Sequence, residues 1–209
     1  MIMKKLLFIC AFLTGNVAMA QNTNLGINAG NAGSGNTSIG YYAGNDVTGY
    51  WNSFTGIFAG RLTSSGSYNV FSGARSGYNS NGYYNTFSGY NSGSQNLGNW
   101  NTFLGAVAGN NHTIGNYNTF VGSESGKNNG GSYNTFTGYR SGLTNTADRN
   151  SFYGSYAGSS NTTGFNNTFM GYQAGQNNVQ AAYNTFVGSY AGTANTAGSF
   201  NTFLGTNAG

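Results

Sequence analysis

From residue 21 to residue 209 the sequence is one short motif written twelve times, and this repetition constrains the fold more than any other feature. The motif is N-T-F-x-G-x-x-[A/S]-G, as in residues 101–109 and 184–192. Every copy keeps the Asn, both Gly and the small residue, and all but the first two have the Phe. After the first pair of copies, which start 14 residues apart, the period is 16 or 17 residues.

A period of this length predicts a particular class of repeat protein. It is too short for two-helix repeats, and the chain lacks the leucine framework of leucine-rich repeats. It fits one coil of a solenoid, in which short strands pair in parallel with neighbouring coils and glycines form the corners. We therefore predict an all-β fold, a parallel β-solenoid (β-roll) of about twelve 16–17-residue coils over residues 21–209. The array is expected to continue beyond Gly209, in a longer chain or by assembly.

Within each coil, N-T-F-x is the predicted strand and G-x-x-A-G a corner, while the variable second half should hold a second short strand and the return turn. Side chains alternate between the two faces of a strand. Phe is nearly constant, and an interior tolerates little change of volume, so Phe and Asn are predicted to point inward. The alternative is the opposite parity, with Phe outward. The predicted structural core is Asn52, Asn69, Asn85, Asn101, Asn118, Asn134, Asn150, Asn167, Asn184 and Asn201 with Phe54, Phe71, Phe87, Phe103, Phe120, Phe136, Phe152, Phe169, Phe186 and Phe203.

The same alternation predicts an outward face that forms an interface or binds a ligand. An aromatic residue precedes the Asn in eight copies: Trp51, Tyr68, Tyr84, Trp100, Tyr117, Tyr133, Tyr183 and Phe200. A row of threonines follows the Asn: Thr86, Thr102, Thr119, Thr135, Thr168, Thr185 and Thr202. Such a face is more than scattered surface hydrophobicity. It favours a subunit interface or stacking that stiffens the sheet. A glycan-binding platform and an ice-binding surface are the alternatives.

The first twenty residues have the pattern of a secretory signal peptide. Lys4 and Lys5 form a positive start, residues 6–13 an apolar run, and residues 18–20 a small-x-small cleavage site. The apolar run is too short to span a bilayer, so no transmembrane segment is expected in the mature chain. Removal of residues 1–20 also removes the single cysteine, Cys10. We predict a secreted protein, extracellular or at a bacterial cell surface.

Composition excludes most chemistry. The predicted mature chain has five basic and three acidic residues, scattered along the repeats, whereas nucleic-acid binding needs a dense basic face. Asp46, Glu124 and Asp148 lie in different copies at unrelated motif positions, which argues against paired-carboxylate catalysis. His112, the single histidine, is expected to be a solvated loop residue. We predict no enzyme, no metal site and no cofactor.

The copy N-T-F-L-G-A-V-A-G at residues 101–109, and N-T-S-I-G-Y-Y-A at residues 36–43, resemble the head repeats of YadA-like trimeric autotransporter adhesins. The chain is also similar to N-T-F-x-G-x-x-A-G arrays in secreted surface proteins of Bacteroidota. The similarity covers residues 21–209, with Phe in place of a small residue and a longer period than the adhesin repeat. The resemblance implies a parallel β-roll, and a homotrimer is implied by it alone.

Together these features predict a non-enzymatic secreted structural repeat protein. It would be a cell-surface adhesin or an extracellular fibre or filament module whose partner is itself, as a homotrimer or filament, assembled through the aromatic and threonine face. The alternative is a glycan- or ice-binding β-solenoid that contacts surface glycans or ice. Functional amyloid is a third possibility, given the Asn and Gly content and the absence of Pro, but regular corners favour a coil over a flat stack.

Overall fold

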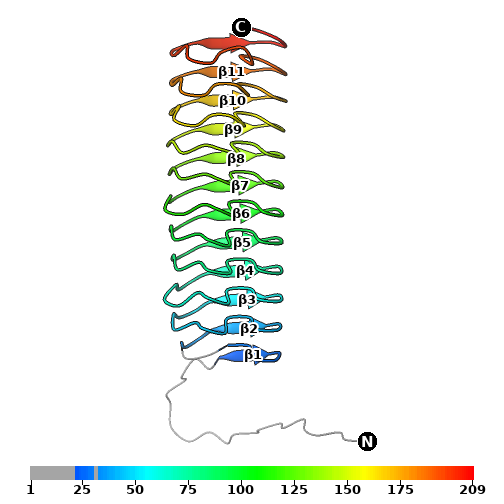
Figure 1. The fold of residues 1–209 in the computed structure, drawn as a ribbon, viewed down its shortest axis with the longest axis vertical. Helices are drawn as coiled ribbons and strands as arrows, with labels where there is room; N and C mark the ends of the chain where they lie inside the picture. The colour runs from blue at the N-terminus through cyan, green and yellow to red at the C-terminus, as the bar shows by residue number, and fades with distance from the viewer. Residues whose placement is uncertain (1–21, 31–32) are drawn as a thin grey trace, which may run out of the picture.

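The computed structural model describes residues 22–30 and 33–209, which form a single column of parallel strands, one for each copy of the motif (Figure 1). The predicted all-β parallel solenoid is confirmed, with no helix in the described part of the chain. Each strand pairs with its sequence neighbours, so the sheet order is the chain order. The predicted signal peptide lies outside the described residues. The strands are β1 Thr23–Leu25, β2 Thr37–Ile39, β3 Ser53–Thr55, β4 Val70–Ser72, β5 Thr86–Ser88, β6 Thr102–Leu104, β7 Thr119–Val121, β8 Thr135–Thr137, β9 Ser151–Tyr153, β10 Thr168–Met170, β11 Thr185–Val187 and β12 Thr202–Leu204.

Every motif position lies directly beside the same position in the next coil. Between β6 and β7, for example, Phe103 pairs with Phe120 and Thr102 with Thr119. The β-branched and aromatic residues of Thr-Phe-x suit a pleated surface. Because the register never slips, each type of side chain forms a continuous row along the rod.

The glycines of the corner are required by close approach as well as by backbone conformation. Gly109 has φ +55°, and a Cβ there would lie 2.4 Å from the ring of Phe103. Gly105 has φ +138°, and its Cβ would lie 2.5 Å from the carbonyl oxygen of Gly122 in the next coil. Only glycine fits both positions, which explains why every copy has both.

The predicted second strand is wrong for the described residues, where each coil has a single three-residue strand. Residues with positive φ, such as Trp100 (+55°) and Val107 (+62°), stand on either side of the strand and interrupt extended backbone. Hydrogen bonds between coils nevertheless continue through the turns, as from Asn111 N to Lys127 O at 2.8 Å. The return half of the coil is therefore bonded to its neighbour without strand geometry.

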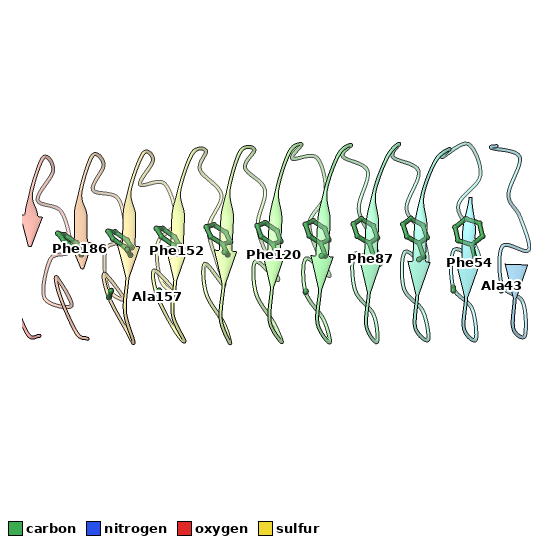
Figure 2. Close-up of a cluster of buried hydrophobic side chains, with 14 of the residues drawn as sticks. Ala43, Phe54, Phe87, Phe120, Phe152, Ala157 and Phe186 are labelled. Atoms are coloured by element: carbon green, nitrogen blue, oxygen red, sulfur yellow. The ribbon is translucent and has the colours of Figure 1, made fainter. Parts of the chain in front are cut away.

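The phenylalanines fill the interior of the coil as one file of rings (Figure 2). Phe54 to Phe186 are fully buried and Phe203, in the last coil, is partly buried. From Phe71 onward, successive ring centroids are 4.7–4.9 Å apart and the planes are nearly parallel. The inward direction of the Phe row follows from the strand alternation, with the coil spacing setting the ring separation.

The asparagines form a ladder of side-chain amides beside the phenylalanine file, and this predicted Asn ladder is confirmed. From Asn22 to Asn184, each side-chain oxygen accepts the backbone N–H of the next Asn in the row, at 2.8–2.9 Å. Most side-chain nitrogens donate to a carbonyl three residues before the next Asn, as from Asn101 to Gly115 at 2.9 Å. Each Asn thereby ties its own coil to the next one.

Candidate functional site

The eight predicted aromatic residues form one exposed row, here called the aromatic row: Trp51, Tyr68, Tyr84, Trp100, Tyr117, Tyr133, Tyr183 and Phe200. Their exposed fractions run from 47% at Trp100 to 77% at Phe200. Their exposure does not result from the alternation of side chains along a strand. Each has φ between +55° and +62°, so it belongs to the turn before the strand.

From Tyr68 to Tyr133 the aromatic row is a continuous stack. Ring centroids are 4.8 Å apart between Tyr68 and Tyr84 and 4.9 Å between Trp100 and Tyr117, with planes within 2° of parallel. The remaining two steps of the run are 5.7 and 5.1 Å. A left-handed conformation costs a non-glycine residue about 1–2 kcal/mol. An aromatic pair contributes about 0.5–1.5 kcal/mol beyond the area it buries, so stacking offsets much of that strain.

This stack leaves ring edges and hydroxyl groups, rather than ring faces, open to solvent. A sugar packs its apolar side on the face of an aromatic ring, and within the run each face is covered by the next ring. The continuous part of the aromatic row is therefore suited to stiffening the rod or to packing edge-on against another surface. Among the described residues, ring faces lack a stacked neighbour between Trp51 and Tyr68, at the interruption between Tyr133 and Tyr183, and beyond Phe200.

The predicted threonines lie on the outward side of the strands, two residues after the aromatic row. Thr86, Thr102, Thr119 and Thr135 follow one another in register, as do Thr168, Thr185 and Thr202. All are exposed or partly exposed. The third strand position, also outward, carries dissimilar residues, including Leu104, Thr137 and Met170. The outer sheet surface thus has one regular row and one irregular row.

The aromatic row is interrupted at Arg149 and Asn166, which keep the same left-handed backbone, with φ +57° and +53°. Beside Asn166, Phe165 contacts Tyr183 edge to face, with centroids 5.2 Å apart. An open hollow of about 250 Å³ lies at this interruption, lined by Thr146, Ala147, Asp148, Arg149 and Phe165.

A second group of exposed and partly exposed aromatic residues lies in the corner after the strand, and it was not predicted from the sequence. Tyr139, Tyr156, Tyr172 and Tyr190 meet edge to face in successive coils, with centroids 5.3–6.4 Å apart. They occupy the two variable positions of G-x-x-A-G, so the signal was a bias of those positions toward Tyr. Nearby, Arg140 bonds Glu124 at 2.9 Å and lies over the ring of Tyr139.

His112 corrects a prediction, because it is fully buried rather than a solvated loop residue. Its Nδ1 lies 2.8 Å from Asn96 Oδ1 and its Nε2 lies 3.0 Å from Asn118 Nδ2. The ladder bond from Asn134 N to Asn118 Oδ1 orients the Asn118 amide so that its nitrogen faces the ring. Nε2 must therefore accept, and burial lowers the pKa of His112 to about 4.

His112 belongs to a second buried row that the sequence analysis also missed. The eleventh residue after each motif Asn points inward; the buried members are Val47, Thr63, Ser80, Asn96, His112, Asn129, Asn145, Asn161 and Asn178. The neutral histidine fits this row because one nitrogen donates to the preceding Asn and the other accepts from the ladder.

Residues 22–30 and 33–209 contain no group of three or more His, Cys, Asp or Glu side chains that could hold a metal ion. Within the same residues, no helix is long and apolar enough to cross a membrane. Comparison with family models, with curated proteins and with solved structures found no match for the chain.

Proposed function

We propose that the chain is a non-enzymatic secreted structural repeat protein, a cell-surface adhesin or extracellular filament module that assembles with copies of itself through the aromatic row and the threonine row. One observation carries the proposal. Five stacked aromatic side chains, Tyr68 to Tyr133, remain about half exposed along one edge of the rod. A contiguous aromatic surface of this kind marks an interaction site more often than bare solvent exposure.

A second copy suits this surface better than an unrelated partner does. Because the register is constant, two rods that meet in parallel make the same contact at every coil, and a modest contact is multiplied along the length. Few charges oppose such an approach, since only 5% of the chain is charged. The resemblance to adhesin head repeats favours a trimer, whereas side-by-side growth would give a filament.

The absence of enzyme activity is part of the proposal and is supported by where the ionisable groups lie. Both ring nitrogens of His112 are bonded inside the rod. Glu124 is paired with Arg140, and an Asp148 oxygen accepts the backbone N–H of Ser132 at 2.7 Å. In the described part of the chain the carboxylates, Asp46, Glu124 and Asp148, belong to different coils and to unrelated motif positions, which argues against a pair for acid–base work. The signal-peptide pattern of residues 1–20 supports secretion.

The alternative function is glycan or ice binding by the free protein. The threonine row supports ice binding, because hydroxyl and methyl groups repeat at the coil spacing. The irregular outer row beside it, with Leu104 and Met170, does not repeat in this way. Glycan binding along the continuous stack is opposed by the covered ring faces.

Sedimentation velocity of the secreted chain over a range of concentrations tests the proposal. The test variant replaces Tyr84, Trp100 and Tyr117 by Asn, which Asn166 shows to be accepted at this position. The matched control replaces Tyr90, an exposed aromatic of the other corner, by Asn. We expect the wild type and the control to form trimers or larger assemblies, and the test variant to remain monomeric. A monomeric wild type, or a test variant that assembles as the wild type does, would refute assembly through this row.

A further inference from the structure

The interruption of the aromatic row is a departure from an otherwise constant surface. Eight coils place an aromatic ring before the motif Asn, whereas two consecutive coils place Arg149 and Asn166 there with unchanged backbone conformation. Rings at these two positions would stack as their neighbours do. The hollow of about 250 Å³ lies beside this interruption, between residues 146–149 and Phe165.

One position of the turn carries a side-chain acceptor in several coils but not in every one, and among the described residues no such bond forms at Tyr83, Phe165 or Ala182. Two residues before the motif Asn, a side-chain oxygen accepts the backbone N–H of the preceding coil, as Asn116 does from Asn99 at 2.7 Å and Asp148 does from Ser132 at 2.7 Å. In the next coil this position is Phe165, which has no acceptor. The N–H of Asp148 consequently has no partner among the described residues, and it lies at the hollow.

The hollow thus combines donors, an acceptor and an aromatic ring. The donors are the Asp148 N–H and the Arg149 guanidinium, which forms no ion pair with a carboxylate in the described part of the chain. The second carboxylate oxygen of Asp148 and the hydroxyl oxygen of Thr146 can accept. The ring of Phe165 is 39% exposed and supplies an apolar surface.

We propose that this hollow binds one neutral pyranose unit of a glycan. Neighbouring sugar hydroxyls each donate and accept, so they match the guanidinium and carboxylate of Arg149 and Asp148 at the same time. The apolar face of the sugar packs on Phe165. For an acidic sugar, repulsion of its carboxylate by Asp148 offsets attraction by Arg149, so its charge brings no net gain over a neutral sugar. The inference rests on the proposed adhesin function and assigns it a ligand class, at the interruption between Tyr133 and Tyr183, where the aromatic row does not cover its own faces.

Frontal affinity chromatography of the secreted chain tests this, since it works whether or not the protein assembles. Separate columns carry mannose, galactose, glucose, N-acetylglucosamine and, for comparison, glucuronate. We expect retention on at least one neutral-sugar column, with a dissociation constant of about 1 mM, and elution by the same free sugar.

Two variants keep the test independent of folding. Arg149→Asn removes the guanidinium at a position where Asn is accepted, and Arg149→Tyr with Asn166→Tyr completes the aromatic row and fills the hollow. Both should weaken retention by about tenfold or more, with an unchanged unfolding temperature or, for the filled row, a higher one. The control Arg75→Asn changes an exposed arginine with the same left-handed backbone elsewhere on the rod and should be retained as the wild type is.

Three results would overturn the inference: no retention on any neutral-sugar column, retention on glucuronate alone, or equal retention of the filled-row variant. Self-association measured on the same samples separates the two proposals. If the chain assembles but is not retained by any sugar, only the proposed sugar site is refuted. If it is retained but stays monomeric, only the proposed assembly is refuted.

Discussion

Each half of the coil contributes a row of buried side chains that includes polar residues, yet the two rows differ greatly in how much their sequence varies. The strand half, from the motif Asn to the second Gly, keeps its Asn in every copy. The inward position of the return half accepts Val47, Thr63, Ser80, Asn96 and His112 in five consecutive coils. Burial alone therefore does not explain why a position is constant.

The difference lies in what each side chain satisfies. The Asn134 oxygen accepts the backbone N–H of Asn150, which has no other acceptor among the described residues. Asn145, in the return half of the same coil, accepts from the side-chain nitrogens of Asn150 and Asn161, and both of these also donate to Gly164 O at 2.8 Å. A backbone donor with one possible partner fixes a residue, whereas side-chain donors with a second partner leave it free to vary.

The largest expected effect is the loss of stability when a buried side chain of the strand half is truncated, compared with a truncation in the return half. Phe120→Ala removes a fully buried ring between Phe103 and Phe136 and should lower the free energy of unfolding by about 3–5 kcal/mol. Ser80→Ala in the return half deletes a buried hydroxyl that has no hydrogen-bond partner among the described residues, so it should leave stability unchanged or raise it. Urea unfolding followed by circular dichroism measures both. Equal losses would erase the distinction between the halves.

A second test compares two glycines across the boundary between the halves. Gly109→Ala introduces a left-handed alanine, at about 1–2 kcal/mol, and a Cβ 2.4 Å from Phe103, for which overpacking costs about 1–3 kcal/mol. Gly130→Ala, in the return half, meets nothing closer than 4.0 Å and has no positive φ. We expect a lower thermal unfolding midpoint for the first variant and no measurable change for the second.

The pH dependence of stability should come from the return half. The pKa of His112 is lowered from 6.5 to about 4 in the folded state, so between these values the unfolded chain binds a proton that the folded chain does not. Stability is then complete above about pH 6.5 and is lost as pH falls toward 4, by about 3 kcal/mol in total. His112→Asn restores the residue of the neighbouring coils and should flatten this dependence. If the variant loses stability on acidification as steeply as the wild type, His112 is not the responsible group.

The solenoid, the Asn ladder and the inward direction of Phe were predictable from the sequence because identical residues recur at a fixed interval, and this interval is both the evidence and the cause of the fold. The burial of His112 was not predictable, because the side chain at this position of the return half points inward in successive coils although the residue type changes from coil to coil. The exposure of Trp100 was predicted for the wrong reason, since period-two alternation says nothing about a residue in a left-handed turn. The hollow beside Arg149 could have been found as a break in the aromatic column of the aligned repeats.

One comparison tests most directly the central claim that a backbone donor with a single acceptor is what fixes the strand half. Asn134→Ala and Asn145→Ala remove the same side chain from fully buried positions of one coil. We predict that the first lowers the free energy of unfolding by about 1–3 kcal/mol more than the second, because it leaves the Asn150 N–H buried and unpaired. Equal losses, or a larger loss at Asn145, would contradict the account.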